Sequence, residues 1–110
     1  MFPPQQEGHI SMQDKFSIQV VDAVMLARIH RIHATETVQD AEMLGNDEAK
    51  VAAIMAIQHA ETALALFREA DSLLPDLQAA RDAKWNGDIV LLESGSALLT
   101  ARQKLGKDAS

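Results

Sequence analysis

The sequence predicts an all-α protein: an antiparallel bundle of three to four helices, with a long first helix, an elongated shape and a dimeric state. The composition is the first observation, because Ala, Glu, Gln, Leu and Met are abundant while Tyr is absent and only one Trp and three Phe occur. Ala, Glu, Gln, Leu and Met are helix formers, whereas several strong strand formers are scarce. The second observation is a stretch from Ser11 to Leu44 without Pro or Gly. We expect a disordered arm over residues 1–10, one helical domain over residues 11–105 and a frayed end over residues 106–110.

The first helix is predicted to begin at Ser11, which follows an arm with two prolines and a glycine. Ser is a preferred N-cap residue, and Asp14 stands at the position of a capping box. A helix from there to Gly45 has about 34 residues and a length of roughly 50 Å, whereas a compact globule of this size is about 35 Å across. Either the helix breaks between His33 and Glu42, or the molecule is elongated and embraces another chain.

Turn residues define the second helix. Gly45 and Asn46 form a stop followed by a new N-cap, and the helix then continues to about Leu74. Pro75 either ends this helix or opens the next as its first residue. Seven alanines between residues 52 and 70 would let neighbouring helices approach closely.

The last third of the chain is predicted to contain a short helix, a cap at Asn86-Gly87 and a final helix. Sevenfold spacings favour helix after the cap; they comprise Trp85, Leu92 and Leu99 in one set and Leu91, Leu98 and Leu105 in the other. Gly95 lies between two serines and is expected at a tight helix crossing. No internal repeat is present.

The stretch Phe16 to Ile32 is apolar around more of its circumference than one buried face requires. One face carries Ile18, Val21, Met25, Ile29 and Ile32. A second ridge, roughly 100° away, is formed by Val20 and Val24. We expect this ridge to bind a partner or a second copy of the chain. The predicted interface consists of Phe16, Val20, Val24 and Ala27 at its centre and Arg28 and Arg31 on its rim.

Charge and composition exclude several classes of function. The net charge is −6, and no basic face that could neutralise phosphates can be assembled, which excludes direct nucleic-acid binding. No segment reaches the ~18 apolar residues of a membrane span, and residues 1–10 lack the basic-then-apolar order of a secretory signal. The absence of Cys fits a reducing compartment, so we expect a cytoplasmic protein.

Candidate chemistry is limited to one group on the first helix. His30, His33, Glu36 and Asp40 are spaced so that the last three fall within about one quadrant, a weak candidate for a zinc or nickel site to which His59 would add a ligand. No nucleophile elbow, phosphate loop or dinucleotide motif is present. We therefore expect no catalytic activity and no cofactor.

Trp85-Asn86-Gly87 matches a Trp-x-Gly signature, and with its size and lack of Cys the chain resembles the WXG100 family of small all-helical secreted bacterial proteins. In that family the motif forms the turn of a central hairpin. Here it lies at position 85 of 110, which leaves too little chain for a matching second arm.

In size, acidity and helicity the chain is also similar to small bacterial regulators, among them quorum-sensing antiactivators and secretion-system chaperones. The resemblance implies a protein that captures a partner, most simply an antiactivator that covers the dimerisation surface of a transcription factor. Three alternatives stay open: a secretion-system chaperone or adaptor, a metal-binding helical protein that uses His30 and His33, and a structural component of a phage or secretion apparatus.

Overall fold

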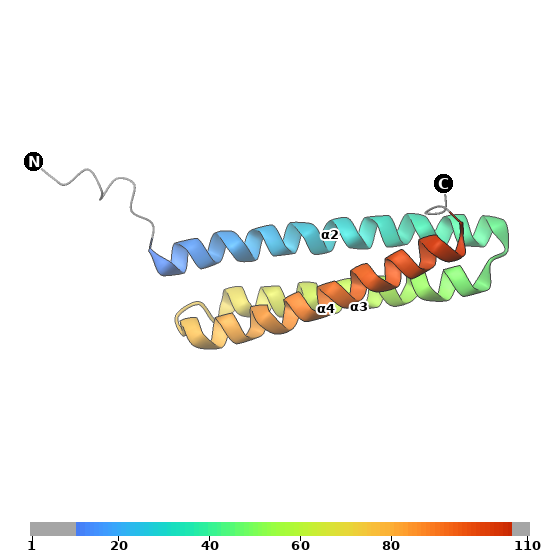
Figure 1. The fold of residues 1–110 in the computed structure, drawn as a ribbon. Helices are drawn as coiled ribbons and strands as arrows, with labels where there is room; N and C mark the ends of the chain where they lie inside the picture. Colours follow the sequence, from blue (N-terminus) through green and yellow to red (C-terminus); the bar gives the residue numbers. More distant parts are fainter. Residues whose placement is uncertain (1–10, 107–110) are drawn as a thin grey trace, which may run out of the picture.

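The computed structural model describes residues 11–106, and these form three helices: α2 (Met12–Leu44), α3 (Asp47–Ser72) and α4 (Leu77–Lys104). Consecutive helices run in opposite directions, so that α2 and α4 are parallel (Figure 1). The central helix is α3, which packs along both others, whereas α2 and α4 touch each other much less. The radius of gyration is 18.0 Å, against about 13 Å for a compact chain of this length. The predicted all-α, elongated fold is confirmed; the predicted arm and residues 107–110 lie outside the described residues.

The helix ends follow the predicted caps. Ser11 Oγ accepts a hydrogen bond from the backbone N–H of Asp14 at 3.0 Å, and Gly45 ends α2 in the left-handed conformation with φ 66°. Asn46 caps α3, and Pro75 lies in the turn before α4. The helix α2 is continuous and the molecule is elongated, so the break that we considered between His33 and Glu42 does not occur.

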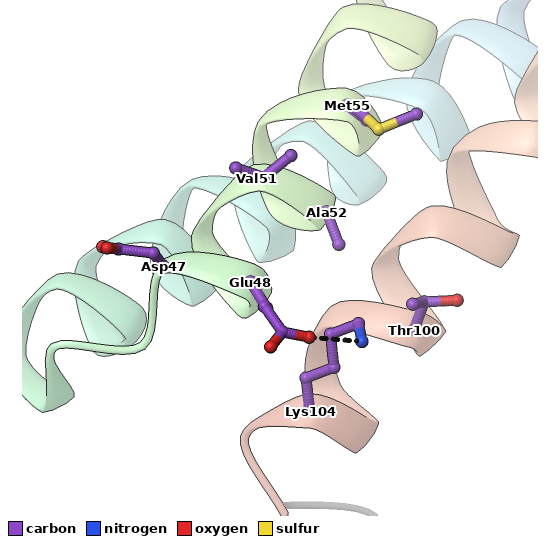
Figure 2. A pocket seen from close by; sticks show the side chains of 7 residues that line it. All are labelled: Asp47, Glu48, Val51, Ala52, Met55, Thr100 and Lys104. Carbon is purple, nitrogen blue, oxygen red and sulfur yellow. Dashed lines mark hydrogen bonds and ion pairs between the residues drawn. The ribbon is translucent and has the colours of Figure 1, made fainter.

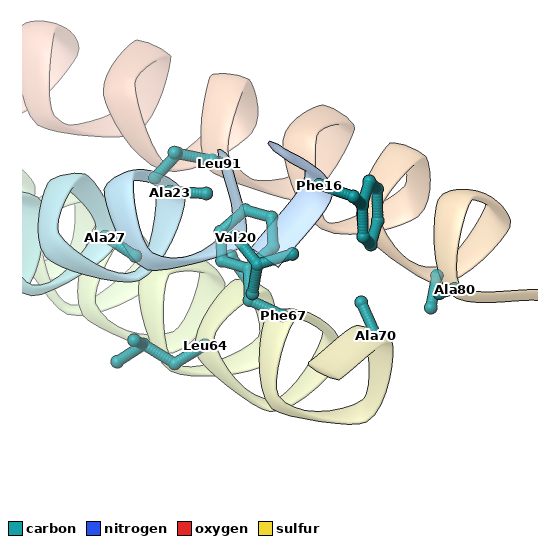
Figure 3. Packing of buried hydrophobic residues seen from close by; sticks show 11 residues of the cluster. Phe16, Val20, Ala23, Ala27, Leu64, Phe67, Ala70, Ala80 and Leu91 are labelled. Atoms are coloured by element: carbon teal, nitrogen blue, oxygen red, sulfur yellow. The ribbon is translucent and has the colours of Figure 1, made fainter. Parts of the chain in front are cut away.

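Small side chains fill most of the core. Along the whole length of α3 the buried face consists mainly of alanine, and small residues also make up most of the buried faces of α2 and α4. We call this the alanine seam; it comprises Ala23, Ala27, Ala34, Ala41, Ala49, Ala52, Ala53, Ala56, Ala60, Ala63, Ala70, Ala80, Ala83 and Ala101. Larger side chains enter the core mainly at the end near the α3–α4 turn, where Phe16, Val20 and Phe67 pack together (Figure 3). Helices that meet through methyl groups approach closely, and their backbones then contribute to the packing.

The prediction of a cap at Asn86-Gly87 is wrong, because α4 runs without a break from Leu77 to Lys104. Gly87 is buried against the ring of Phe67, and a Cβ added there would lie 2.6 Å from Phe67 Cε1. The glycine therefore serves close helix packing, and the turn that Asn-Gly usually signals does not form. The expected tight crossing at Gly95 is confirmed. A Cβ on Gly95 would lie 3.1 Å from His30 Cε1 on α2, and the adjacent Ser94 Oγ donates a hydrogen bond to the carbonyl of Ala56 at 2.8 Å.

Candidate protein-interaction surfaces

The structure places the predicted interface residues of α2 mostly inside the monomer. Phe16, Val20 and Ala27 are buried by α3 and α4, and Val24 is half-buried against the same cluster. Arg28 is exposed and lies at a hollow of about 230 Å³ between α2 and α3. Arg31 is half-buried. In this fold the ridge of Val20 and Val24 is therefore occupied by the chain's own helices, and a partner can reach only its rim.

The outer side of α2 carries the residues that an amphipathic helix would usually bury. Five large aliphatic side chains are about half exposed there; we call them the α2 stripe, namely Ile18, Val21, Met25, Ile29 and Ile32. At 100° per residue they are centred opposite the buried face of the helix. The expected assignment of the two faces is thus reversed. The physical reason is that α3 presents an alanine surface, against which the small residues of α2 pack more closely than isoleucine would allow.

A second exposed stripe follows the outer side of α4. The α4 stripe consists of Trp85, Ile89, Leu92 and Leu99, and its most exposed members are Trp85 at 67% and Leu92 at 75%. With Ser96 the five positions are spaced by four, three, four and three residues, which is the spacing of a coiled-coil seam. Trp85 also borders a hollow that includes Phe16 and Gln19 of α2. The α4 stripe lies opposite the buried face of its helix, as the α2 stripe does.

A third apolar surface lies at the far end of the bundle, between α3 and α4 (Figure 2). This groove has a volume of about 470 Å³; it is lined by Asp47, Glu48, Val51, Ala52, Met55, Thr100 and Lys104. Lys104 Nζ and Glu48 Oε2 form an ion pair at 3.1 Å between the two helices. The exposed parts of Val51 and Met55 supply the apolar wall. The groove is suited to accept one or two apolar side chains rather than a whole helix.

His30 and His33 of the candidate metal group lie in different surroundings in the structure. His30 faces Gly95 at the α2–α4 contact, and its Nδ1 is buried without a hydrogen-bond partner among the described residues. Burial, and to a smaller degree the neighbouring His33, lower the pKa of His30 below its usual value. His33 Nδ1 lies 3.4 Å from Glu36 Oε1, in a hollow that also contains Asp40 and Arg102. Within residues 11–106, no three His, Asp or Glu side chains are placed to hold a metal ion.

Sequence reasoning recognised the spacing of both stripes but not their exposure. Trp85, Leu92 and Leu99 are seven residues apart, and so are Leu91 and Leu98. Of these five side chains, only those of Leu91 and Leu98 are buried. A signal that separates the two sets was present, because Ala83, Gly87, Ser94 and Ala101 are small residues that share a face with Leu91 and Leu98. A face rich in small residues is the one that fits the alanines of α3.

No helix within the described residues has the length and apolar character needed to cross a membrane. No family model, no curated protein and no solved structure matches this chain.

Proposed function

We propose that this chain is a non-enzymatic protein-binding module that captures a helical partner through the α4 stripe. The single observation that carries the proposal is the seam of large apolar side chains on the solvent side of α4, opposite a face that is already packed. Exposed apolar patches of this kind mark interaction sites, because leaving them in water is costly. Coiled-coil spacing favours a partner that is itself an amphipathic helix.

The composition of the α4 stripe supports binding. Trp85 offers a large flat surface of the kind that dominates interface energetics, and Leu92 is the centre of the row. Burying a fully exposed side chain of this type contributes about 1.5–3 kcal/mol. Four of them at the observed exposures contribute roughly 4–7 kcal/mol, while association costs about 4–15 kcal/mol. A partner must therefore bring a matching apolar face of its own.

In its narrower form the proposal makes the module a regulator. A captured helix that belongs to the dimerisation surface of a transcription factor would be unavailable for dimerisation, so stoichiometric binding alone would inactivate the factor. The similarity in size, charge and helicity to small acidic bacterial regulators supports this form, and a secretion chaperone would use the same surface.

The test is quantitative co-purification from the native cell with Leu92→Glu and a matched control, Leu44→Glu. Both leucines are exposed, but Leu44 lies at the end of α2 and outside the stripe. Both variants should keep their helical circular dichroism and a stability within about 0.5 kcal/mol of wild type, because surface changes have small effects. The wild type and Leu44→Glu should retain a partner that Leu92→Glu loses. A partner retained equally by Leu92→Glu would overturn the role of this face.

A further inference from the structure

We propose that the α2 stripe binds a second copy of the same chain, in an antiparallel pair of α2 helices related by a two-fold axis at Met25. The inference uses α2 alone and stands whether or not the α4 stripe captures a client. It concerns the face of α2 opposite the one that the sequence pattern favoured.

The spacing of the α2 stripe is symmetric about its centre. Counted from Met25, its members stand at −7, −4, 0, +4 and +7. A two-fold interface requires a surface that is complementary to its own rotated copy. In an antiparallel pair centred on residue 25, Ile18 of one copy is level with Ile32 of the other, and Val21 is level with Ile29. Met25 meets Met25, a flexible side chain that adapts to its own copy.

The amount of apolar surface is suited to a dimer. Five aliphatic side chains at about half exposure present roughly 500 Å² of apolar surface, a size at which the largest apolar patch of a protein is often a functional site. Each partner in a standard interface buries about 800 Å², of which the rim is polar. Asp22 and Arg28, which flank the stripe on its two sides, provide such a rim. The stripe itself contains no charged side chain.

Two acidic residues mark where the pairing of the α2 helices ends. One further step along the same row places Asp14 at −11 and Glu36 at +11 from Met25. These carboxylates end the apolar row on both sides, so the contact covers about four turns of α2. Antiparallel pairing in addition opposes the two helix dipoles, which parallel pairing would align.

Disulfide trapping tests the geometry, because the chain contains no cysteine of its own. Under mild oxidation, Met25→Cys should form a covalent dimer with itself. Ile18→Cys alone should not, because the two copies of residue 18 would be 14 positions apart, roughly 21 Å along the axis, and a disulfide needs Cα atoms within about 7 Å. An equimolar mixture of Ile18→Cys and Ile32→Cys, with an affinity tag on one of them, should give the mixed dimer. Leu44→Cys, which is exposed at the end of α2 and outside both stripes, is the control for random collision.

Three outcomes would overturn the proposal. Self-linking of Ile18→Cys that exceeds the mixed product would show parallel pairing. Cross-linking of Leu44→Cys that matches that of Met25→Cys would show that the cross-link at Met25 arises from random collision. Failure of Met25→Cys to cross-link at any concentration would show that the stripe does not pair.

The mass in solution provides a second readout that does not depend on cysteine chemistry. Sedimentation equilibrium of the full chain should give a dimer whose dissociation constant rises at least about 100-fold in Met25→Glu, because two carboxylates would be buried in an apolar contact. The far-ultraviolet circular dichroism of the dilute variant should match that of the dilute wild type. An unchanged dissociation constant would contradict the proposal.

Discussion

At the residue scale, glycines and alanines determine how closely the helices of this bundle approach. Gly87 is the clearest case, since the ring of Phe67 occupies the space that a methyl group would need. A glycine in the middle of a helix usually costs about 1 kcal/mol relative to alanine. Glycine is nevertheless needed at this position. Phe67, the largest fully buried side chain among the described residues, packs directly against the backbone of Gly87.

We therefore predict that Gly87→Ala destabilises the protein, although the same change stabilises most helices. The expected loss is about 1–3 kcal/mol, the usual cost of overpacking, and it should appear as a lower midpoint in urea. In a Phe67→Leu background the change Gly87→Ala should cost less than in the wild type, because leucine leaves room for the new methyl group. A Gly87→Ala variant more stable than wild type would show that the contact with Phe67 is loose.

His30 should make the stability of the fold depend on pH. Its pKa is lowered in the folded state, chiefly by burial, so the folded protein binds a proton less readily than the unfolded chain does. The stability that this group contributes is complete above its unfolded pKa of about 6.5 and is lost as the pH falls below that value. The urea midpoint should therefore decrease between pH 7.5 and pH 5.5. His30→Gln should show a smaller decrease; an equal decrease would assign the effect to other groups.

At the element scale, the connection between α2 and α3 also holds the end of α4. Asn46 Oδ1 accepts a hydrogen bond from the N–H of Ala49 and so caps α3, while Asn46 Nδ2 donates to the carbonyl of Lys104 at 3.0 Å. One side chain thus forms hydrogen bonds with a backbone N–H at the start of α3 and with a backbone carbonyl at the end of α4. The ion pair between Lys104 and Glu48 joins the same two helices beside it.

The two roles of Asn46 can be separated by substitution. Asn46→Ala should cost about 1–2 kcal/mol, because the cap and the bond to α4 are both lost. Asn46→Ser should cost less, since serine caps as well as asparagine but does not reach Lys104. Thermal unfolding of the three proteins measures both differences. Equal stability of the Ser and Ala variants would show that the cap contributes nothing here.

The ends of the elements could largely be predicted from the sequence, whereas the direction in which each helix faces could not. Ser11, Gly45, Asn46 and Pro75 act locally, and the structure places them at helix ends or in turns. Gly87 misled the prediction because its partner, Phe67, is distant in the sequence. Periodicity located both stripes on single faces, but a pattern on one helix does not reveal which face its neighbours can accept. That choice depends on the alanines of α3.

At the scale of the whole molecule, the contacts that hold the helices together do not also cover the large aliphatic side chains, whereas in a usual small helical domain one core does both. The alanine seam holds three long helices together, and most large aliphatic side chains remain on the outside. A thin core of this kind leaves limited hydrophobic stabilisation in the monomer, because a methyl group buries little surface. Pairing through the α2 stripe would add to it, so stability should rise with protein concentration.

The melting temperature of the wild type should increase between micromolar and hundred-micromolar chain concentration, since dimerisation stabilises the folded state by mass action. In Met25→Glu the melting temperature should not change with concentration. A wild type whose melting temperature is also independent of concentration would argue against any stable self-association.

The helix α2 faces its own bundle with the Val20 side and faces the solvent or a partner with the Val21 side. Equilibrium unfolding of Val20→Ala and Val21→Ala, at a concentration where the chain is monomeric, tests this orientation most directly. The two valines are adjacent and undergo the same change, but Val20 is 2% exposed and Val21 is 53% exposed. We expect Val20→Ala to lose about 1–3 kcal/mol and Val21→Ala to change by less than about 0.5 kcal/mol. A loss at Val21 equal to or larger than that at Val20 would show that the stripe is the core face and would contradict the account.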